Sequence, residues 1–204
     1  MKAALVGIPA NLFVGHEPAR RAVVQHLLSS KLPGERWAIL DNDPASGAAL
    51  PSGPDVLISV VADGCICCNA VGLRVELTRL LSRARPQRLL VLPSRQARIP
   101  EVIRLLSDRW LAPVLNLRAT IAVVNAADDD LQAAGNADRE SLFAGVNIVA
   151  LETTGTHEGV AGLAHEVLAH VAPHARVVRV VNGGLDPGLL DEPGWPARPM
   201  FSSS

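Results

Sequence analysis

Hydrophobic runs alternate along the chain with segments in which apolar residues recur every three or four positions. The runs end in short polar turns, which is typical of buried strands, and the periodic segments are typical of helices that cover a sheet. This alternation predicts an α/β fold with a mostly parallel central sheet. The expected strands are residues 3–14, 37–40, 56–61, 88–92, 120–124, 146–151 and 176–181, and the expected helices are residues 16–30, 73–84, 101–110 and 158–171, with another helix beginning at residues 128–130.

Length and composition predict one globular domain. The chain has 204 residues, of which 49% are hydrophobic, and a formal net charge of -1. We expect a single domain over residues 1–190 and a Pro/Gly/Ser-rich tail over residues 191–204. The near-neutral charge gives no general attraction to nucleic acid or to an anionic membrane, and no apolar run reaches the roughly 18 residues of a membrane span. We therefore predict no nucleic-acid or membrane partner, and a cytoplasmic location.

The strongest chemical signal is a group of three cysteines, the only ones in the chain. They are Cys65, Cys67 and Cys68, placed between an apolar run and an amphipathic helix. Without other cysteines as partners they are poorly explained as a disulfide framework, and in a reducing compartment we expect all three thiols to be free for a soft metal. Thiol redox chemistry and simple packing beside the helix are the alternatives.

The three sulfurs alone are expected to leave a zinc site incomplete. Adjacent Cys67 and Cys68 can seldom both reach one ion without strain, so two or three sulfurs with an outside ligand form the expected site. Asp41 and Asp43, which follow a neighbouring strand, are the predicted carboxylate ligands.

The loop after the first strand is where many α/β proteins bind phosphate. Here Gly15, Arg20 and Arg21 are the candidate phosphate contacts, but the loop has one glycine, a proline and Glu17. A phosphate loop needs several glycines, a lysine and a Ser or Thr for magnesium. Glu17 would repel phosphate, so the loop is a poor match to that pattern.

The segment Gly64-Cys65-Ile66-Cys67-Cys68, followed by an amphipathic helix, resembles the GCICC motif of the CobW-type P-loop GTPases. Similar stretches extend over nearly the whole chain. The resemblance implies a three-layer P-loop-NTPase-like domain, zinc or another transition metal as the bound ion, a recipient metalloprotein as partner, and homodimer formation. The further stretches that carry it are 8–15, 23–28, 41–43, 122–126, 137–139 and 185–190.

The departures from the family pattern all fall on nucleotide contacts. Arg20 and Arg21 stand where the family has the phosphate-loop Lys and Thr, residues 92–95 lack the switch carboxylate and glycine, and residues 151–155 lack the guanine-reading carboxylate. We therefore predict a metal-binding domain for delivery, storage or sensing that lacks a functional GTP–magnesium site and is not an enzyme. The alternatives are an active GTPase with an unorthodox loop, and an interaction module whose arginine-rich middle docks a partner.

Overall fold

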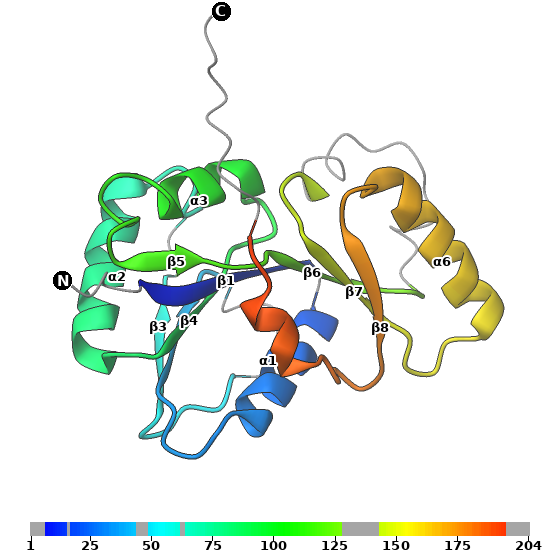
Figure 1. Ribbon diagram of the computed structural model, residues 1–204, viewed down its shortest axis with the longest axis horizontal. Helices are drawn as coiled ribbons and strands as arrows, with labels where there is room; N and C mark the ends of the chain where they lie inside the picture. Colours follow the sequence, from blue (N-terminus) through cyan, green and yellow to red (C-terminus); the bar gives the residue numbers. More distant parts are fainter. Residues whose placement is uncertain (1–6, 16, 44–48, 62–63, 128–142, 195–204) are drawn as a thin grey trace, which may run out of the picture.

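The computed structural model describes residues 7–15, 17–43, 49–61, 64–127 and 143–194, and its centre is an eight-stranded sheet (Figure 1). Seven strands follow the order β3-β2-β4-β1-β6-β7-β8, and β5 pairs with β1 beside this path. Every pairing between these strands is parallel, which confirms the predicted α/β class. The strands are β1 (Ile8–Gly15), β2 (Trp37–Asp41), β3 (Val56–Val60), β4 (Arg88–Leu92), β5 (Leu115–Leu117), β6 (Ile121–Asn125), β7 (Ile148–Glu152) and β8 (Arg176–Val180).

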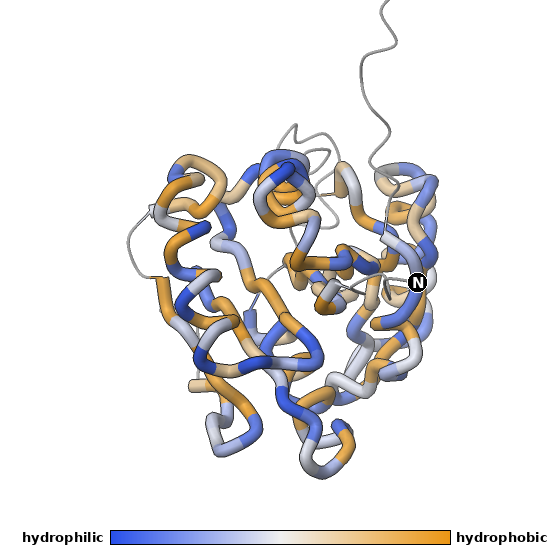
Figure 2. Tube along the Cα trace, turned by 60° about the vertical axis from the view of Figure 1, so that its left-hand side comes forward, coloured by the Kyte–Doolittle hydropathy of each residue, from blue (hydrophilic) through white to orange (hydrophobic). Residues whose placement is uncertain are grey.

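Strand position in the sheet follows from the hydrophobic pattern. All residues of β2, β4 and β7 are buried, as expected of parallel strands that are covered on both faces. The end strands β3 and β8 have partly exposed residues along most of their length. In Figure 2 the trace of the central strands is mainly orange, whereas the outer helices alternate between orange and blue.

Helices cover both faces of the sheet and give three layers. On one face α2 (Ala70–Ala84), α3 (Ile99–Leu106) and α6 (Glu158–Val171) pack over one hydrophobic core. On the other, α1 (Ala19–Ser30) and the 3₁₀ helix η2 (Pro187–Asp191) pack over a second core. No helix among the described residues is long and apolar enough to cross a bilayer.

The expected helix over residues 101–110 is wrong at both ends. In the structure α3 begins two residues earlier, with Pro100 in its first turn, where a missing N–H costs nothing. It ends at Leu106, because the Asp108 carboxylate accepts the backbone N–H groups of Trp110 and Leu111 and so competes with helix continuation. The strand β5, only three residues long, and η2 were not predicted, and the expected helix start at residues 128–130 lies outside the described residues.

The carboxyl ends of the parallel strands meet at one edge of the sheet, where the candidate residues follow β1, β2 and β3. Gly15 ends β1 with φ of 109°, and a Cβ there would lie 2.0 Å from the carbonyl oxygen of Val123 on β6. The glycine at this position is therefore required for the close approach of β1 and β6.

Candidate functional site

The two arginines of the candidate phosphate loop lie in the first turn of α1 and are buried. Arg20 is fully buried and donates to three groups: the Glu17 carboxylate at 3.0 Å, the Pro93 carbonyl at 2.8 Å and the Asp43 carboxylate at 2.9 Å. Its three nitrogens are thus all bound to groups of the protein itself.

Arg21 is also held by groups of the protein, through hydrogen bonds from its Nη2 atom, while its buried Nε makes no hydrogen bond. It donates to the Asp41 carboxylate at 3.1 Å and to the Asp43 carbonyl at 2.7 Å, and its Nε lies 3.5 Å from the Glu17 carboxylate. The Glu17 carboxylate also accepts the backbone N–H of Arg21 at 3.3 Å. A carboxylate therefore occupies the N-terminus of α1, the place where a bound phosphate is stabilised in phosphate loops.

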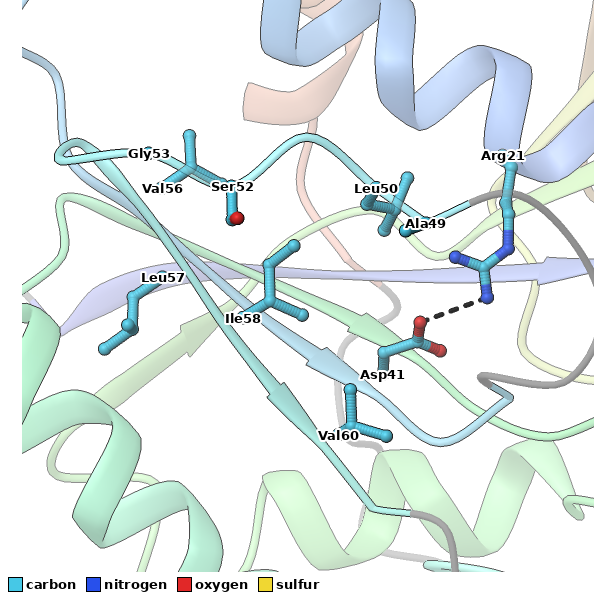
Figure 3. Close-up of a pocket in the computed structure, with 10 residues that line it drawn as sticks. All are labelled: Arg21, Asp41, Ala49, Leu50, Ser52, Gly53, Val56, Leu57, Ile58 and Val60. Carbon is cyan, nitrogen blue, oxygen red and sulfur yellow. Dashed lines mark hydrogen bonds and ion pairs between the residues drawn. The ribbon is translucent and has the colours of Figure 1, made fainter.

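We call Glu17, Arg20, Arg21, Asp41 and Asp43 the arginine–carboxylate network. It combines two guanidinium groups with three carboxylates, so the group has no excess of positive charge to offer a phosphate. A cavity of about 600 Å³ lies beside it, between β3 and residues 49–53 (Figure 3). Its walls are mainly apolar, and the Arg21 and Asp41 side chains at its end are bound to each other.

The predicted metal ligands separate into two places. The sulfurs of Cys65, Cys67 and Cys68 lie within 4.8 Å of one another and form the one such group of potential ligands found among the described residues. Asp41 and Asp43 are not members of this group, since they pair with Arg21 and Arg20. Their predicted role as ligands remains a prediction.

The cysteine loop is a tight turn fixed at both ends. The Ile66 side chain is 2% exposed and anchors the turn in the core under α2. Gly64, before the turn, adopts a φ of 73°. The Cys68 N–H donates to the Cys65 carbonyl at 3.0 Å, which closes the turn. Asn69 then caps α2 by accepting the Gly72 N–H at 2.8 Å.

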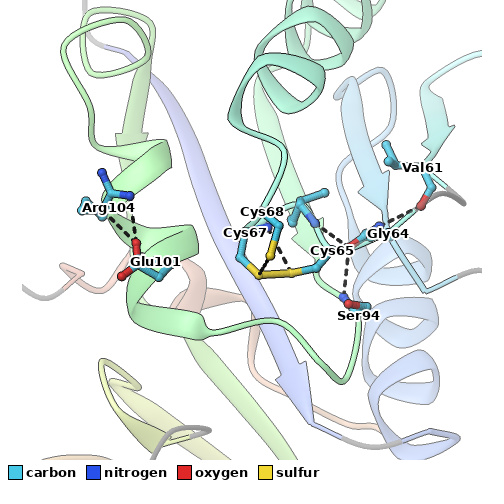
Figure 4. The surroundings of a disulfide bond; sticks show 10 residues. Val61, Gly64, Cys65, Cys67, Cys68, Ser94, Glu101 and Arg104 are labelled. Atoms are coloured by element: carbon cyan, nitrogen blue, oxygen red, sulfur yellow. Dashed lines mark hydrogen bonds and ion pairs between the residues drawn. A yellow bond between two sulfur atoms is a disulfide. The ribbon is translucent and has the colours of Figure 1, made fainter.

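Within this turn Cys65 and Cys67 form a disulfide, and Cys68 is free and exposed (Figure 4). The expectation that all three thiols are free is therefore wrong for Cys65 and Cys67 in this structure. The turn places their Cα atoms 5.2 Å apart, within the range that a disulfide spans. The Cys68 sulfur lies 3.6 Å from that of Cys67.

Glu152, at the end of β7, is a buried carboxylate at the same edge of the sheet that the sequence pattern did not single out. Its carboxylate accepts the Thr154 N–H at 2.9 Å, the Gly183 N–H at 2.8 Å and the Thr154 hydroxyl. Burial raises the pKa of this carboxyl group, but these hydrogen bonds outweigh burial and hold the pKa below its usual range. The sequence signal that could have identified Glu152 is a charged residue directly at the end of an apolar strand, where ligand-binding residues of α/β sheets often lie.

A lowered pKa in the folded state means that Glu152 stabilises the fold above the carboxyl's usual pKa and loses this effect as pH falls through the folded value. Glu152→Gln is expected to lower the free energy of unfolding by about 1–3 kcal/mol at pH 7, because its backbone donors lose a charged acceptor. The difference from the wild type should shrink below about pH 4.5. Urea unfolding of both proteins from pH 7 to pH 3.5 measures it, and a constant difference would contradict the assignment.

Comparisons with known proteins identify the family and the fold of the chain. The family model described as CobW/HypB/UreG, nucleotide-binding domain, matches residues 20–179. The Escherichia coli zinc chaperone YeiR is 32% identical over 133 residues, which cover 62% of this chain and 40% of YeiR. The chain thus spans about two fifths of the length of this curated relative.

Two solved structures show the same fold at low sequence identity. Zn(II)-bound YjiA GTPase from Escherichia coli superimposes with a TM-score of 0.62 at 19% identity, over 91% of this chain and 61% of YjiA. HypB from Helicobacter pylori in complex with nickel gives a TM-score of 0.52 at 10% identity, over 90% of this chain and 82% of HypB.

Proposed function

The chain belongs to the CobW/HypB/UreG family of nucleotide-binding domains, and we propose that it binds zinc or a similar transition metal through Cys65, Cys67 and Cys68. The observation that carries the proposal is the grouping of three sulfurs within 4.8 Å at the carboxyl-end edge of the sheet. Zinc prefers thiolate ligands in such clusters, and a zinc chaperone and a zinc-bound GTPase are among the similar proteins.

The metal-binding form is the reduced one. Metals bind thiolates, so the Cys65–Cys67 disulfide must be a dithiol before these two sulfurs can become ligands. Three thiolates leave one tetrahedral position open. Asp41 or Asp43 would have to leave its arginine to fill it, whereas water or a group of a recipient metalloprotein needs no such rearrangement. An open position suits delivery, storage or sensing of a metal.

We further propose that the domain does not bind GTP with magnesium. Glu17 fills the anion position at the N-terminus of α1, and both arginines that replace the family's Lys and Thr are bound to carboxylates. At the end of β7, the N–H groups of Thr154 and Gly183 donate to Glu152 and are therefore not free to bind a nucleotide. Phosphoryl transfer depends on positioned cations and donors that are free to meet the nucleotide.

Metal titration of the reduced protein tests the proposal. With a competing chromophoric chelator, the wild type is expected to bind about one zinc ion per chain, and the triple variant C65S/C67S/C68S none. Val71→Ser, an exposed change in the first turn of α2, is the control and should bind as the wild type does. Equal zinc binding by the triple variant would overturn the assignment.

Nucleotide titration separates this proposal from an active GTPase. In the presence of magnesium we expect no GTP binding tighter than about 100 μM, which is about -5.5 kcal/mol. Tighter binding would show that the arginine–carboxylate network opens to admit phosphate, and would favour the GTPase. The interaction-module alternative predicts instead that capture of a partner is unchanged in the triple cysteine variant.

A further inference from the structure

One buried amide joins the cysteine loop to the rest of the sheet edge. The Asn42 side chain is 4% exposed and uses both of its polar atoms. Its Nδ2 donates to the carbonyls of Val61 at 2.8 Å and Gly64 at 2.9 Å, and its Oδ1 accepts the N–H groups of Ile66 at 3.2 Å and Ser94 at 3.4 Å. These four partners fix the orientation of the amide.

Two of these partners flank Cys65. The carbonyl of Gly64 precedes it and the N–H of Ile66 follows it, so the same side chain holds the backbone on both sides of the first cysteine. The Cys65 carbonyl in turn accepts the Cys68 N–H and closes the turn that carries the other sulfurs. The position of all three sulfurs therefore depends on the backbone that Asn42 holds.

Asn42 itself is held by the arginine–carboxylate network. Its two sequence neighbours, Asp41 and Asp43, are bound by Arg21 and Arg20. Arg20 also binds the Pro93 carbonyl, and the next residue, Ser94, donates to Asn42. The Asn42 side chain thus connects the arginine–carboxylate network to the cysteine loop. The backbone on both sides of Asn42 is held by the ion pairs of Asp41 and Asp43.

We propose that Asn42 is a positioning residue for metal binding, which presents Cys65, Cys67 and Cys68 as a preformed set of ligands. This inference rests on the proposed function of the cysteines as metal ligands. Side chains that orient the ligands of a metal typically contribute about 10–100-fold to its affinity. Because Arg21 and Arg20 bind Asp41 and Asp43, the sequence neighbours of Asn42, we expect the zinc affinity of this site not to depend on GTP.

Asn42→Ala and Asn42→Asp test the proposal in the reduced protein. Alanine removes all four hydrogen bonds, whereas the isosteric aspartate keeps the acceptor but turns an oxygen toward the carbonyls of Val61 and Gly64. Both variants are expected to raise the zinc Kd by about 10–100-fold. Saturated with cobalt(II), they should also show a weaker thiolate-to-cobalt charge-transfer band per ion, which a general loss of stability would not change.

Asn11→Ala is the matched control. Asn11 is also fully buried and bound through both polar atoms, but to Ala119, Leu190 and Arg88, none of which is in the cysteine loop. It should lose stability while keeping the zinc Kd and cobalt spectrum of the wild type. If Asn42→Ala does not fold, the zinc Kd and the cobalt spectrum of Asn42→Asp decide the test.

The outcomes separate the two proposals. If a folded Asn42 variant keeps the wild-type zinc Kd and cobalt spectrum while the triple cysteine variant loses zinc, Asn42 is not a positioning residue and the cysteine assignment stands. If the triple cysteine variant binds zinc as the wild type does, the proposed function fails first. Zinc affinity that rises on addition of GTP would contradict the independence from nucleotide.

Discussion

Replacing Arg20 by alanine is expected to lower the free energy of unfolding by about 3–5 kcal/mol, one of the two largest effects that the structure predicts. The change removes the guanidinium group that the Glu17 and Asp43 carboxylates share, and it removes the bond that ties α1 to the Pro93 carbonyl. Arg20 is fully buried, so water cannot replace these contacts without opening the fold. Chemical denaturation at neutral pH measures the loss.

The matched control is Arg104→Ala. Arg104 pairs with Glu101 on the surface of α3, where the two side chains are 68% and 45% exposed. Removal of such a pair is expected to cost at most about 1 kcal/mol. If Arg20→Ala and Arg104→Ala lower the free energy of unfolding equally, the arginine–carboxylate network does not stabilise the fold as proposed.

The variant Arg20→Lys tests whether a lysine at this position is sufficient for GTP binding. It restores the residue type that the resemblance places at this position, but a single ammonium group cannot reach three partners as the planar guanidinium does. We expect a smaller loss of stability than for alanine and still no GTP binding, because Glu17 remains at the N-terminus of α1.

Much of the fold could be predicted because its strands are buried on both faces. The runs that became β2, β4 and β7 are apolar at nearly every position, so a local pattern was sufficient to find them. The end of α3 depends on the single carboxylate of Asp108, and β5 is too short to show a period. Such features are decided by individual hydrogen bonds, which a hydrophobic pattern does not record.

In the candidate site, too, features local in the sequence could be predicted, whereas contacts between distant residues could not. The cysteines are close in sequence, so their spacing was enough to predict a cluster. The pairs of Arg20 with Asp43 and of Arg21 with Asp41 join residues more than 19 positions apart, and only the order of β1, β2 and β4 in the sheet brings them together. The sequence therefore identified Asp41 and Asp43 as carboxylates near the carboxyl-end edge of the sheet, but it did not show that they pair with arginines.

Oxidation is expected to abolish zinc binding, the other of the two largest effects. When a small-molecule disulfide oxidises the Cys65 and Cys67 thiols, one protein disulfide and two small thiols form, and two of the three sulfur ligands are lost. The remaining thiol, Cys68, is exposed, and Asp41 and Asp43 are bound to arginines. One thiolate in this setting is too few for a stable zinc site, which normally has three or four protein ligands.

The measurement compares three samples of one preparation: reduced, oxidised, and oxidised then reduced again. Thiol titration should give three, one and three thiols, since one disulfide forms and reopens. Zinc retained after desalting should be about one, zero and one ion per chain. The third sample separates reversible loss of ligands from damage. If the sample with one titratable thiol retains zinc, ligands other than Cys65 and Cys67 hold the metal, and the sulfur cluster is not its main binding site.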